Sequence, residues 1–535
     1  MDRGNAASPA SPDSAQAAGP QSPKPAARWL LAALLAVAAL TRLYNLDVAP
    51  YFFCDEAYLA DTALHVARQG TLTRYFFDCP VLVYGKPPFH YLLVAGAFKC
   101  LGFGVWQGRL VSVVFGLGSA AVVFLIGRAV GGHRGGLVAL LLYAFSRYAL
   151  YVDRSVKAEA QTTFFALACI YLLWLASERR SSGLGLAAGL MLGLSLASKP
   201  TGWYLAPAGL GFLLVAVWRA EEGRRRMALL AVAFVVGCAL VVGPWAAIHE
   251  HLARQPPYDS QPIPEELFGR EITELRADLF LQRPTPYGLA RSLVNTLGKQ
   301  FLRSPLALIG MIGLGLLSLN GGRMGRLLVW CAATGVVAYA AVGGAAPRYL
   351  HAVYVVTLIA AAGWLAALAT ERLRTRRNWL LLGLVLALCV QEFCFVVHKD
   401  GIAFQPVVER DDVEMVAAQW MAQNLPPNAR PYCAANIGLL TGRDYVPILV
   451  LRNQPAVREY FGVDYLVVDR YFAQAAMRGD CDNPFRHFDL ALRHRVGDPR
   501  DPRRVEIYEI VGPAPPFPGA GGDWLLWRDP SYNIY

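Results

Sequence analysis

The sequence contains few charged residues for its length. Of its 535 residues only 17% are Asp, Glu, Lys or Arg, whereas 55% are hydrophobic. About a quarter of the residues in an ordinary soluble domain are charged, so this composition excludes a soluble globular protein. Repeated apolar runs of roughly 17–25 residues are typical of membrane-spanning helices. The chain is therefore predicted to be a polytopic α-helical membrane protein.

The sequence also lacks the spacing of a metal site. Its 10 cysteines include no C-x-x-C pair, and the His-Glu-His run at 249–251 places its two imidazoles on different faces of a helix. No metal ligands are predicted, and a need for a divalent metal cofactor stays open. Two cysteine pairs are predicted to face an oxidising compartment, where each can form a disulfide that spacing alone does not establish: Cys54 with Cys79, and Cys433 with Cys481.

The net charge of +11 points to nucleic acid only in a soluble chain. Here the basic residues fall in short clusters between apolar runs, a pattern that sets membrane orientation. We therefore predict membrane lipids as surroundings and no nucleic-acid partner. The clusters are Arg128/Arg134, Arg179/Arg180, Arg219 with Arg224–Arg226, Arg323/Arg326 and Arg372/Arg374/Arg376/Arg377.

The apolar runs predict a membrane domain at residues 28–399 that follows a disordered cytoplasmic tail at 1–27. About 11 helices are expected. The first begins at Trp29 and reaches about Leu46, with Arg42 extending to the outer interface. The other runs lie near 106–127, 136–151, 160–176, 183–198, 201–218, 227–247, 304–319, 326–343, 348–369 and 378–397.

Placing every basic cluster on the cytoplasmic side gives one topology, with the amino terminus inside and the carboxyl terminus outside. Extracytoplasmic loops are then expected at 47–105 and 248–303. The second loop contains a predicted amphipathic helix over 267–279. The Tyr51–Tyr91 segment, the Asp153–Glu159 turn and the Arg348 turn would share the outer face.

The composition from residue 400 onwards is that of a soluble domain. A helix is predicted to end at Asn424, before two prolines, and strands are predicted at Tyr445–Leu451, Tyr465–Asp469 and Val505–Val511. We expect a small extracytoplasmic α/β domain at 400–512, which covers the membrane cavity or helps to bind an acceptor, and a tail at 513–535.

Two acidic residues stand at the start of the first outer loop. Asp55 and Glu56 follow the first helix closely, so they should lie near the membrane interface. A carboxylate that is partly removed from water gains proton affinity and can act as a general base. Taken alone, these two residues favour a structural role, with Asp55 as the N-cap of a helix, and the other polar groups of the outer face shift the interpretation towards a site.

Cations accompany these acids on the predicted outer face. Lys86 precedes two prolines that restrict its backbone, and Arg348-Tyr349 opens a helix on the side where positive charge is disfavoured. Both cations suit a phosphate at headgroup depth, although interfacial anchoring explains them too. Further candidates for contact with a substrate are Tyr58, Tyr84, Asp153, Arg154 and Glu159, the last of which also suits a helix amino terminus.

Together these groups suit the displacement of a phosphate leaving group by a hydroxyl that a carboxylate activates. A polyprenyl-phosphate sugar fits such a site, because its lipid tail stays in the bilayer while its headgroup reaches the outer face. An internal repeat, typical of transporters, is not evident. A transporter or flippase of a lipid-linked saccharide is the alternative, and a membrane scaffold for the outer domain is a third reading.

The sequence resembles the GT-C glycosyltransferases of the aminoarabinose transferase and protein O-mannosyltransferase type, over roughly residues 28–400. The resemblance rests on short motifs in a fixed order: Arg42, Asp55-Glu56-Ala57-Tyr58, Lys86-Pro87-Pro88, Arg154 with Glu159 before Phe164, and Arg348-Tyr349. Two positions depart from it, because Glu159 stands where many relatives have Asp, and Gly85 where some have an acid.

The resemblance implies inverting transfer of a hexosyl or pentosyl group from a polyprenyl-phosphate sugar to a lipid, glycan or protein acceptor. It implies that Asp55 is the catalytic carboxylate, that Lys86 and Arg348 bind the donor phosphate, and that Glu159 is the second acidic position. A bacterial enzyme of the inner membrane is expected, with its active site in the periplasm.

Overall fold

A computed structural model of the chain describes residues 25–47, 54–70, 73–76, 79–82, 87–220, 222–254, 294, 305–320, 322–341, 350–372, 383, 387, 390, 413–447, 458–459, 461–469, 472–473, 487–500 and 504–513. The predicted amphipathic helix at 267–279 and nearly all of both tails and of the apolar run at 378–397 lie outside these ranges. The first outer loop is described in part.

Helices occupy the predicted apolar runs that the structure describes. They are α1 (Pro25–Leu43), α4 (Val105–Phe145), α5 (Arg147–Asp153), α6 (Glu159–Arg179), α7 (Ser182–Ser198), η2 (Pro200–Tyr204), α8 (Leu205–Trp218), α9 (Arg224–Arg254), α13 (Pro305–Asn320), α14 (Arg323–Ala341) and α15 (His351–Arg372). Within the described ranges, five helical segments are long and apolar enough to cross a membrane, and others are shorter. The chain is therefore a mostly helical, multi-pass membrane protein.

Helix α4 covers two of the predicted helices and reverses direction at Gly131-Gly132. Gly132 has φ +65°, a left-handed conformation that favours glycine. The two halves, 105–130 and 133–145, pack so closely that a Cβ added at Gly127 would lie 2.7 Å from the Cβ of Ala139. The run predicted at 136–151 does not continue as one helix, because the Ser146 hydroxyl accepts a hydrogen bond from the Ala149 amide and begins α5.

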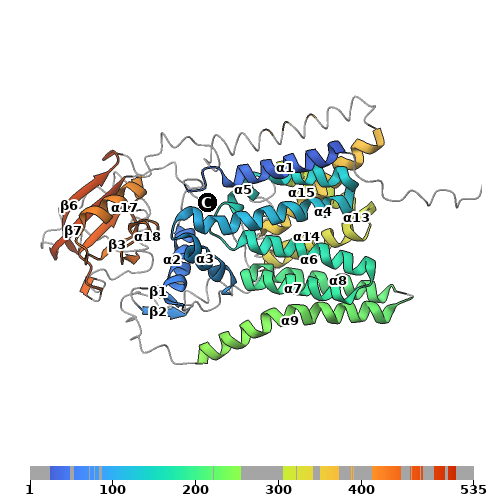
Figure 1. Cartoon of the computed structure of the whole chain (residues 1–535), viewed down its shortest axis with the longest axis horizontal. Coiled ribbons are helices and arrows are strands. Elements are labelled where there is room, and N and C mark those ends of the chain that lie inside the picture. Colours follow the sequence, from blue (N-terminus) through green and yellow to red (C-terminus); the bar gives the residue numbers. More distant parts are fainter. Residues whose placement is uncertain are drawn as a thin grey trace, which may run out of the picture.

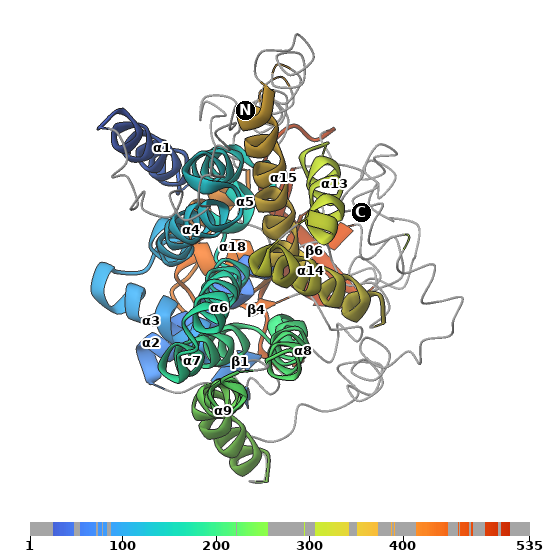
Figure 2. The same cartoon turned by 90° about the vertical axis from the view of Figure 1, so that its right-hand side faces the viewer.

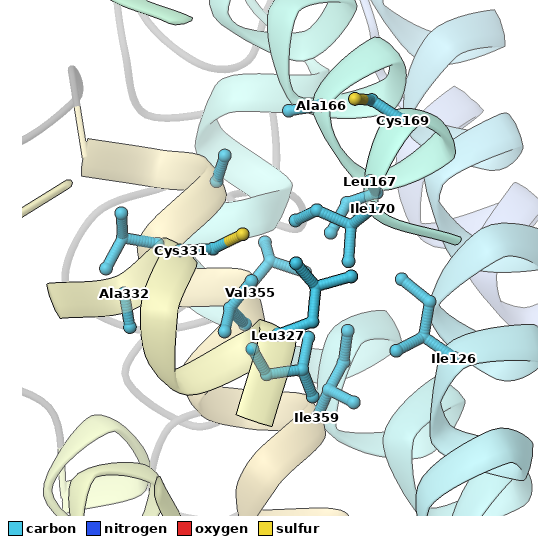
Figure 3. Close-up of a cluster of buried hydrophobic side chains, with 14 of the residues drawn as sticks. Ile126, Ala166, Leu167, Cys169, Ile170, Leu327, Cys331, Ala332, Val355 and Ile359 are labelled. Atoms are coloured by element: carbon cyan, nitrogen blue, oxygen red, sulfur yellow. The ribbon is translucent and has the colours of Figure 1, made fainter. Parts of the chain in front are cut away.

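An apolar core joins α4, α6, α14 and α15. Ile126, Leu167, Leu327 and Ile359, one from each of these helices, are all buried. Figure 3 shows these side chains with Cys331 and Val355 meeting between the helices. Viewed from the end of the bundle, α14 and α15 lie beside α13, on the opposite side of α6 from α7 and α9 (Figure 2).

Polar contacts mark both ends of the bundle. At one end, Arg323 at the start of α14 lies 3.5 Å from Glu178 near the end of α6. At the other end, the turn between α5 and α6 contacts the end of α1 and the start of α2 (Cys54–Gln69). Figure 1 shows α2 at the end of the bundle opposite the α8–α9 turn.

The segment after α1 supplies α2, a hairpin of β1 (Thr73–Phe76) and β2 (Cys79–Leu82), and α3 (Phe89–Leu101). Helix α2 packs along α3 through Ala57, Ala60 and Val94. Leu439, from the carboxyl-terminal region, is buried in the same apolar cluster. That region therefore packs on the polar end of the bundle, where Figure 1 shows it.

The carboxyl-terminal region contains a five-stranded mixed sheet in the order β4-β3-β5-β7-β6, with helices α17 and α18 packed beside it. Its elements are α17 (Val413–Asn424), β3 (Pro431–Cys433), α18 (Ala435–Thr441), β4 (Val446–Pro447), β5 (Tyr465–Val468), β6 (Phe488–Val496) and β7 (Val505–Pro513). Strands β4, β3 and β5 are parallel, and β7 is antiparallel to both β5 and β6.

Two details differ from the expectations for this region. Strand β6 was not predicted, because Arg493, His494 and Arg495 interrupt its apolar alternation. Cys433 is a buried free thiol, so the disulfide considered between Cys433 and Cys481 is not formed. The side chains of Cys54 and Cys79 lie outside the described part of the chain.

Candidate active site

The end of α1 is tied to the α5–α6 turn by a buried ion pair. The Nε of Arg42 donates to Oδ2 of Asp153 over 2.8 Å, and both side chains are at most 1% exposed. The hydroxyl of Tyr143 donates to the same oxygen over 2.8 Å. The predicted extension of Arg42 to the membrane interface is therefore wrong, because a carboxylate in the bundle holds it inside.

Arg154 contacts the carboxyl-terminal end of α1. Its Nη1 donates to the carbonyl oxygens of Thr41 and Arg42, and its Nη2 donates to that of Asn45. Helix ends leave carbonyl groups without partners inside the helix, and this guanidinium satisfies several of them. Asp153 and Arg154, both predicted to contact substrate, thus make contacts within the protein.

Glu56 holds the start of α2 in place. Its carboxylate accepts two hydrogen bonds from the guanidinium of Arg109, over 3.0 and 3.3 Å, and a third from the backbone amide of Val156. The Nη1 of Arg109 donates to the carbonyl of Leu46. Glu56 is 1% exposed, so this network fixes the first turn of α2 against α4 and the α5–α6 turn.

Several predicted residues fall in or beside parts of the chain that are not described. Asp55 lies in the first turn of α2, next to the anchored Glu56, and its side chain is outside the described set. Tyr84, Lys86, Arg348 and Tyr349 lie outside it entirely. Tyr58 is half-buried on α2 and packs against the α2–α3 apolar cluster.

Glu159 begins α6, as predicted, and forms an ion pair that no sequence pattern indicated. The Nζ of Lys199, at the end of α7, lies 2.7 Å from Oε1 of Glu159. Glu159 is 4% exposed. Its position in the first helical turn adds the favourable field of the helix amino terminus.

Lys157, in the turn before α6, is a further buried cation. Its Nζ donates to the hydroxyl of Tyr151 over 2.8 Å and lies above the ring of the same residue. Burial lowers the pKa of Lys157, but the Tyr151 hydroxyl, Glu56 and Glu159 outweigh it, so the pKa lies above its ordinary value. Lys157 is therefore a cation at neutral pH.

Two histidines complete the polar end of the bundle. His90, in the first turn of α3, is 1% exposed, and its Nδ1 lies 3.2 Å from Oε1 of Gln161 on α6. His351 begins α15, is 1% exposed and packs against the ring of Tyr148. A lone histidine in an apolar segment gives no periodic signal, so only the nearby Lys86 and Arg348 could have drawn attention to these positions.

The described polar groups thus converge on one end of the bundle from α1, α2, α3, α4, α6, α7 and α15. Buried charges there have an oppositely charged partner or hydrogen bonds, which limits the cost of burying them in a medium of low polarity. Within the described residues, no group of three or more His, Cys, Asp or Glu side chains is arranged to hold a metal ion. The arrangement brings carboxylates, one of which could act as a general base, together with several cations at the polar end of the bundle.

Comparison with solved structures shows how the helices are assembled. ArnT from Cupriavidus metallidurans in its apo state matches with a TM-score of 0.61 at 16% identity, over 91% of this chain and 98% of ArnT. The same protein bound to undecaprenyl phosphate gives 0.58 at 16% identity, over 92% and 99%. The chain therefore shares the fold of ArnT, the fold that the GT-C resemblance implied. The predicted resemblance is confirmed at the level of the fold.

Two further comparisons agree with the GT-C fold. The oligosaccharyltransferase of Archaeoglobus fulgidus matches with a TM-score of 0.60 at 14% identity, over 86% of this chain and 73% of that protein. The family model of dolichyl-phosphate-mannose-protein mannosyltransferases matches residues 85–245, a range that includes His90, Glu159 and Lys199. No curated protein sequence matches the chain.

Proposed function

We propose that this chain is a membrane glycosyltransferase that moves a sugar from a polyprenyl-phosphate donor to an acceptor. The observation that carries the proposal is the GT-C fold combined with the convergence of Glu56, Glu159, Lys157 and Lys199 on one end of the bundle. ArnT, which shares the fold, has been solved with undecaprenyl phosphate. A lipid donor reaches such a site from within the bilayer.

In the proposed reaction Asp55 takes the proton of an acceptor hydroxyl. The hydroxyl oxygen forms a bond to the anomeric carbon of the sugar as the bond from that carbon to the phosphate oxygen breaks. The polyprenyl phosphate leaves with the bonding electrons, so the anomeric configuration inverts. Lys86 and Arg348 stabilise the charge that develops on the phosphate.

The internal contacts assign supporting roles to three other predicted residues. Glu56 fixes the turn of α2 that carries Asp55, and Asp153 and Arg154 hold the α5–α6 turn against α1. We propose that these three are positioning residues. Glu159 lies next to the donor as the second acid, and Tyr58 and Tyr84 line the approach from the first loop.

The carboxyl-terminal sheet lies at the same end of the bundle as these groups, which supports a role in covering the site or binding the acceptor. We place that end on the periplasmic side of a bacterial inner membrane, because the basic clusters at the opposite end mark the cytoplasm. The acceptor carries a hydroxyl or phosphate on a lipid, glycan or protein, and the sugar is a hexose or pentose.

The test compares membranes with and without the protein. Lipid and glycan profiles of a deletion strain should show an accumulated polyprenyl-phosphate sugar and the loss of one conjugate, both restored by the wild-type gene. A flippase would instead move labelled lipid-linked sugar across sealed vesicles without consuming it. Unconsumed donor on both faces of the vesicles would exclude the transferase.

A further inference from the structure

Four buried nitrogen atoms at the polar end of the bundle have no hydrogen-bond partner within the described structure. They are Nδ1 and Nε2 of His351, Nε2 of His90 and Nε2 of Gln161. The three side chains are at most 1% exposed. A buried polar atom without a partner costs about 1–3 kcal/mol, so native proteins keep few of them, and those call for a specific explanation.

These nitrogens belong to one cluster. His90 and Gln161 contact each other across α3 and α6. Glu159 lies two residues before Gln161, and its negative charge acts on the imidazoles of both His90 and His351. Lys199 is paired with Glu159. The beginnings of α3, α6 and α15 and the end of α7 therefore bring these polar groups together around Glu159.

In the sequence, two members of this cluster closely follow the proposed phosphate-binding residues. His90 follows Lys86 by four residues, and His351 follows Arg348 by three. Since an extended chain advances at most about 3.6 Å per residue, the covalent chain allows at most roughly 15 Å between the Cα atom of each cation and that of the histidine that follows it. This spacing is compatible with a sugar that is attached to a bound phosphate and contacts the cluster.

The chemistry of the cluster suits hydroxyl groups. Imidazole and amide nitrogens donate or accept single directed hydrogen bonds, whereas Lys199 already has its carboxylate partner. The rings of Tyr148 and Tyr354 pack against His351 and add aromatic surface. We propose that His90, Gln161 and His351 form the subsite for the hydroxyl groups of the donor's sugar, an inference that rests on the proposed function.

Two binding measurements on the purified full chain test this subsite. The probes are undecaprenyl phosphate and undecaprenyl phosphate carrying mannose, glucose, galactose or arabinose. We expect wild type to bind at least one sugar-bearing lipid more tightly than the bare lipid. His351→Phe and His90→Phe should each weaken binding of the sugar-bearing lipid roughly tenfold, which corresponds to the loss of about one hydrogen bond. Both variants should bind the bare lipid as wild type does.

His133→Phe is the matched control, because His133 follows the Gly131-Gly132 reversal of α4 and also has a buried Nε2 without a partner in the described structure. It should bind every probe as wild type does. His351→Phe should also raise the melting temperature of the lipid-free protein, since it removes buried polar atoms that lack partners. If His351 instead had a structural role, His351→Phe would lower the melting temperature.

The outcomes separate this subsite from the proposed function. The subsite is overturned if wild type binds no sugar-bearing lipid more tightly than the bare lipid. It is also overturned if His351→Phe keeps the wild-type difference in affinity. Equal losses with bare and sugar-bearing lipid overturn it too, because they assign His351 to the phosphate or to folding. Failure of wild type to bind undecaprenyl phosphate at all removes the proposed donor class itself.

Discussion

Arg42 and Asp153 lie 111 positions apart in the sequence and form a buried ion pair of 2.8 Å. Their contact joins the end of the first helix to the turn that leads to Glu159. A buried pair is costly to break from one side, because the remaining charge is left in a medium of low polarity. The pair therefore fixes where the α5–α6 turn sits.

Replacing Arg42 with Met is expected to destabilise the protein by about 3–5 kcal/mol, measured as the free energy of unfolding in detergent. Arg323→Met is the control, because Arg323 and its partner Glu178 are 50% and 41% exposed. An exposed pair contributes about 0–1 kcal/mol. Equal effects of the two substitutions on the free energy of unfolding would show that burial does not make the Arg42–Asp153 pair more important for stability.

Replacing Glu56 with Gln should lower both stability and sugar transfer. The guanidinium of Arg109 would lose its charged partner, and the α2 turn that carries Asp55 would lose its anchor. Glu56→Asp retains the charge on a shorter side chain, so it should recover part of the stability and little of the transfer rate. Transfer assays on matched amounts of folded protein check this. Full transfer by Glu56→Gln would contradict a positioning role.

The sequence predicted the positions of the helices better than it predicted which side chains contact one another. Apolar runs mark α6, α7 and α8 directly, because membrane burial depends on local composition. Arg42 was misplaced because its partner, Asp153, is distant in the chain. His90 and His351 were missed because a single polar residue in an apolar segment has no pattern. Only the fold shows that they gather around Glu159.

The reversal within α4 predicts a marked difference between two glycines. A Cβ at Gly127 would lie within 3 Å of Ala139 and of the carbonyl of Gly135, whereas a Cβ at Gly96, on α3, meets nothing within 4 Å. Gly127→Ala should therefore destabilise the chain by forcing the halves of α4 apart, by about 1–3 kcal/mol. Gly96→Ala should stabilise it by up to about 1 kcal/mol. Melting temperatures of the two variants measure this, and a stable Gly127→Ala would refute the close packing.

Glu506 should make the carboxyl-terminal sheet sensitive to acid. Burial raises the pKa of Glu506, but hydrogen bonds from Tyr508, Arg495 and Arg504 outweigh it, so the pKa lies below its ordinary value of 4.5. The ionised carboxylate therefore stabilises the fold above the ordinary pKa, and this contribution is lost as the pH falls through the folded value.

Glu506→Gln should consequently increase hydrogen exchange in β6 and β7 near neutral pH, and its difference from wild type should shrink below about pH 4. Glu509→Gln, on the same strand, is the control, since the Glu509 side chain is 35% exposed and its partner Arg493 is 51% exposed. A difference that stays constant from neutral to acidic pH would rule out the titration of Glu506.

The catalytic assignment makes the most direct prediction. Asp55→Asn should reduce sugar transfer at least a hundredfold, the usual loss when a positioned general base is removed, while leaving the melting temperature near that of wild type. Asp444→Asn, an exposed change in the carboxyl-terminal region, controls for a general effect of removing an acid.

Lys86→Ala should instead weaken binding of undecaprenyl phosphate, because it removes a cation from the proposed phosphate site. Transfer rates and lipid affinities of the three variants, measured on the same preparations, separate the two roles. Normal transfer by Asp55→Asn would move the base to another residue, and Glu159, buried at the same end of the bundle, would be the next carboxylate to replace.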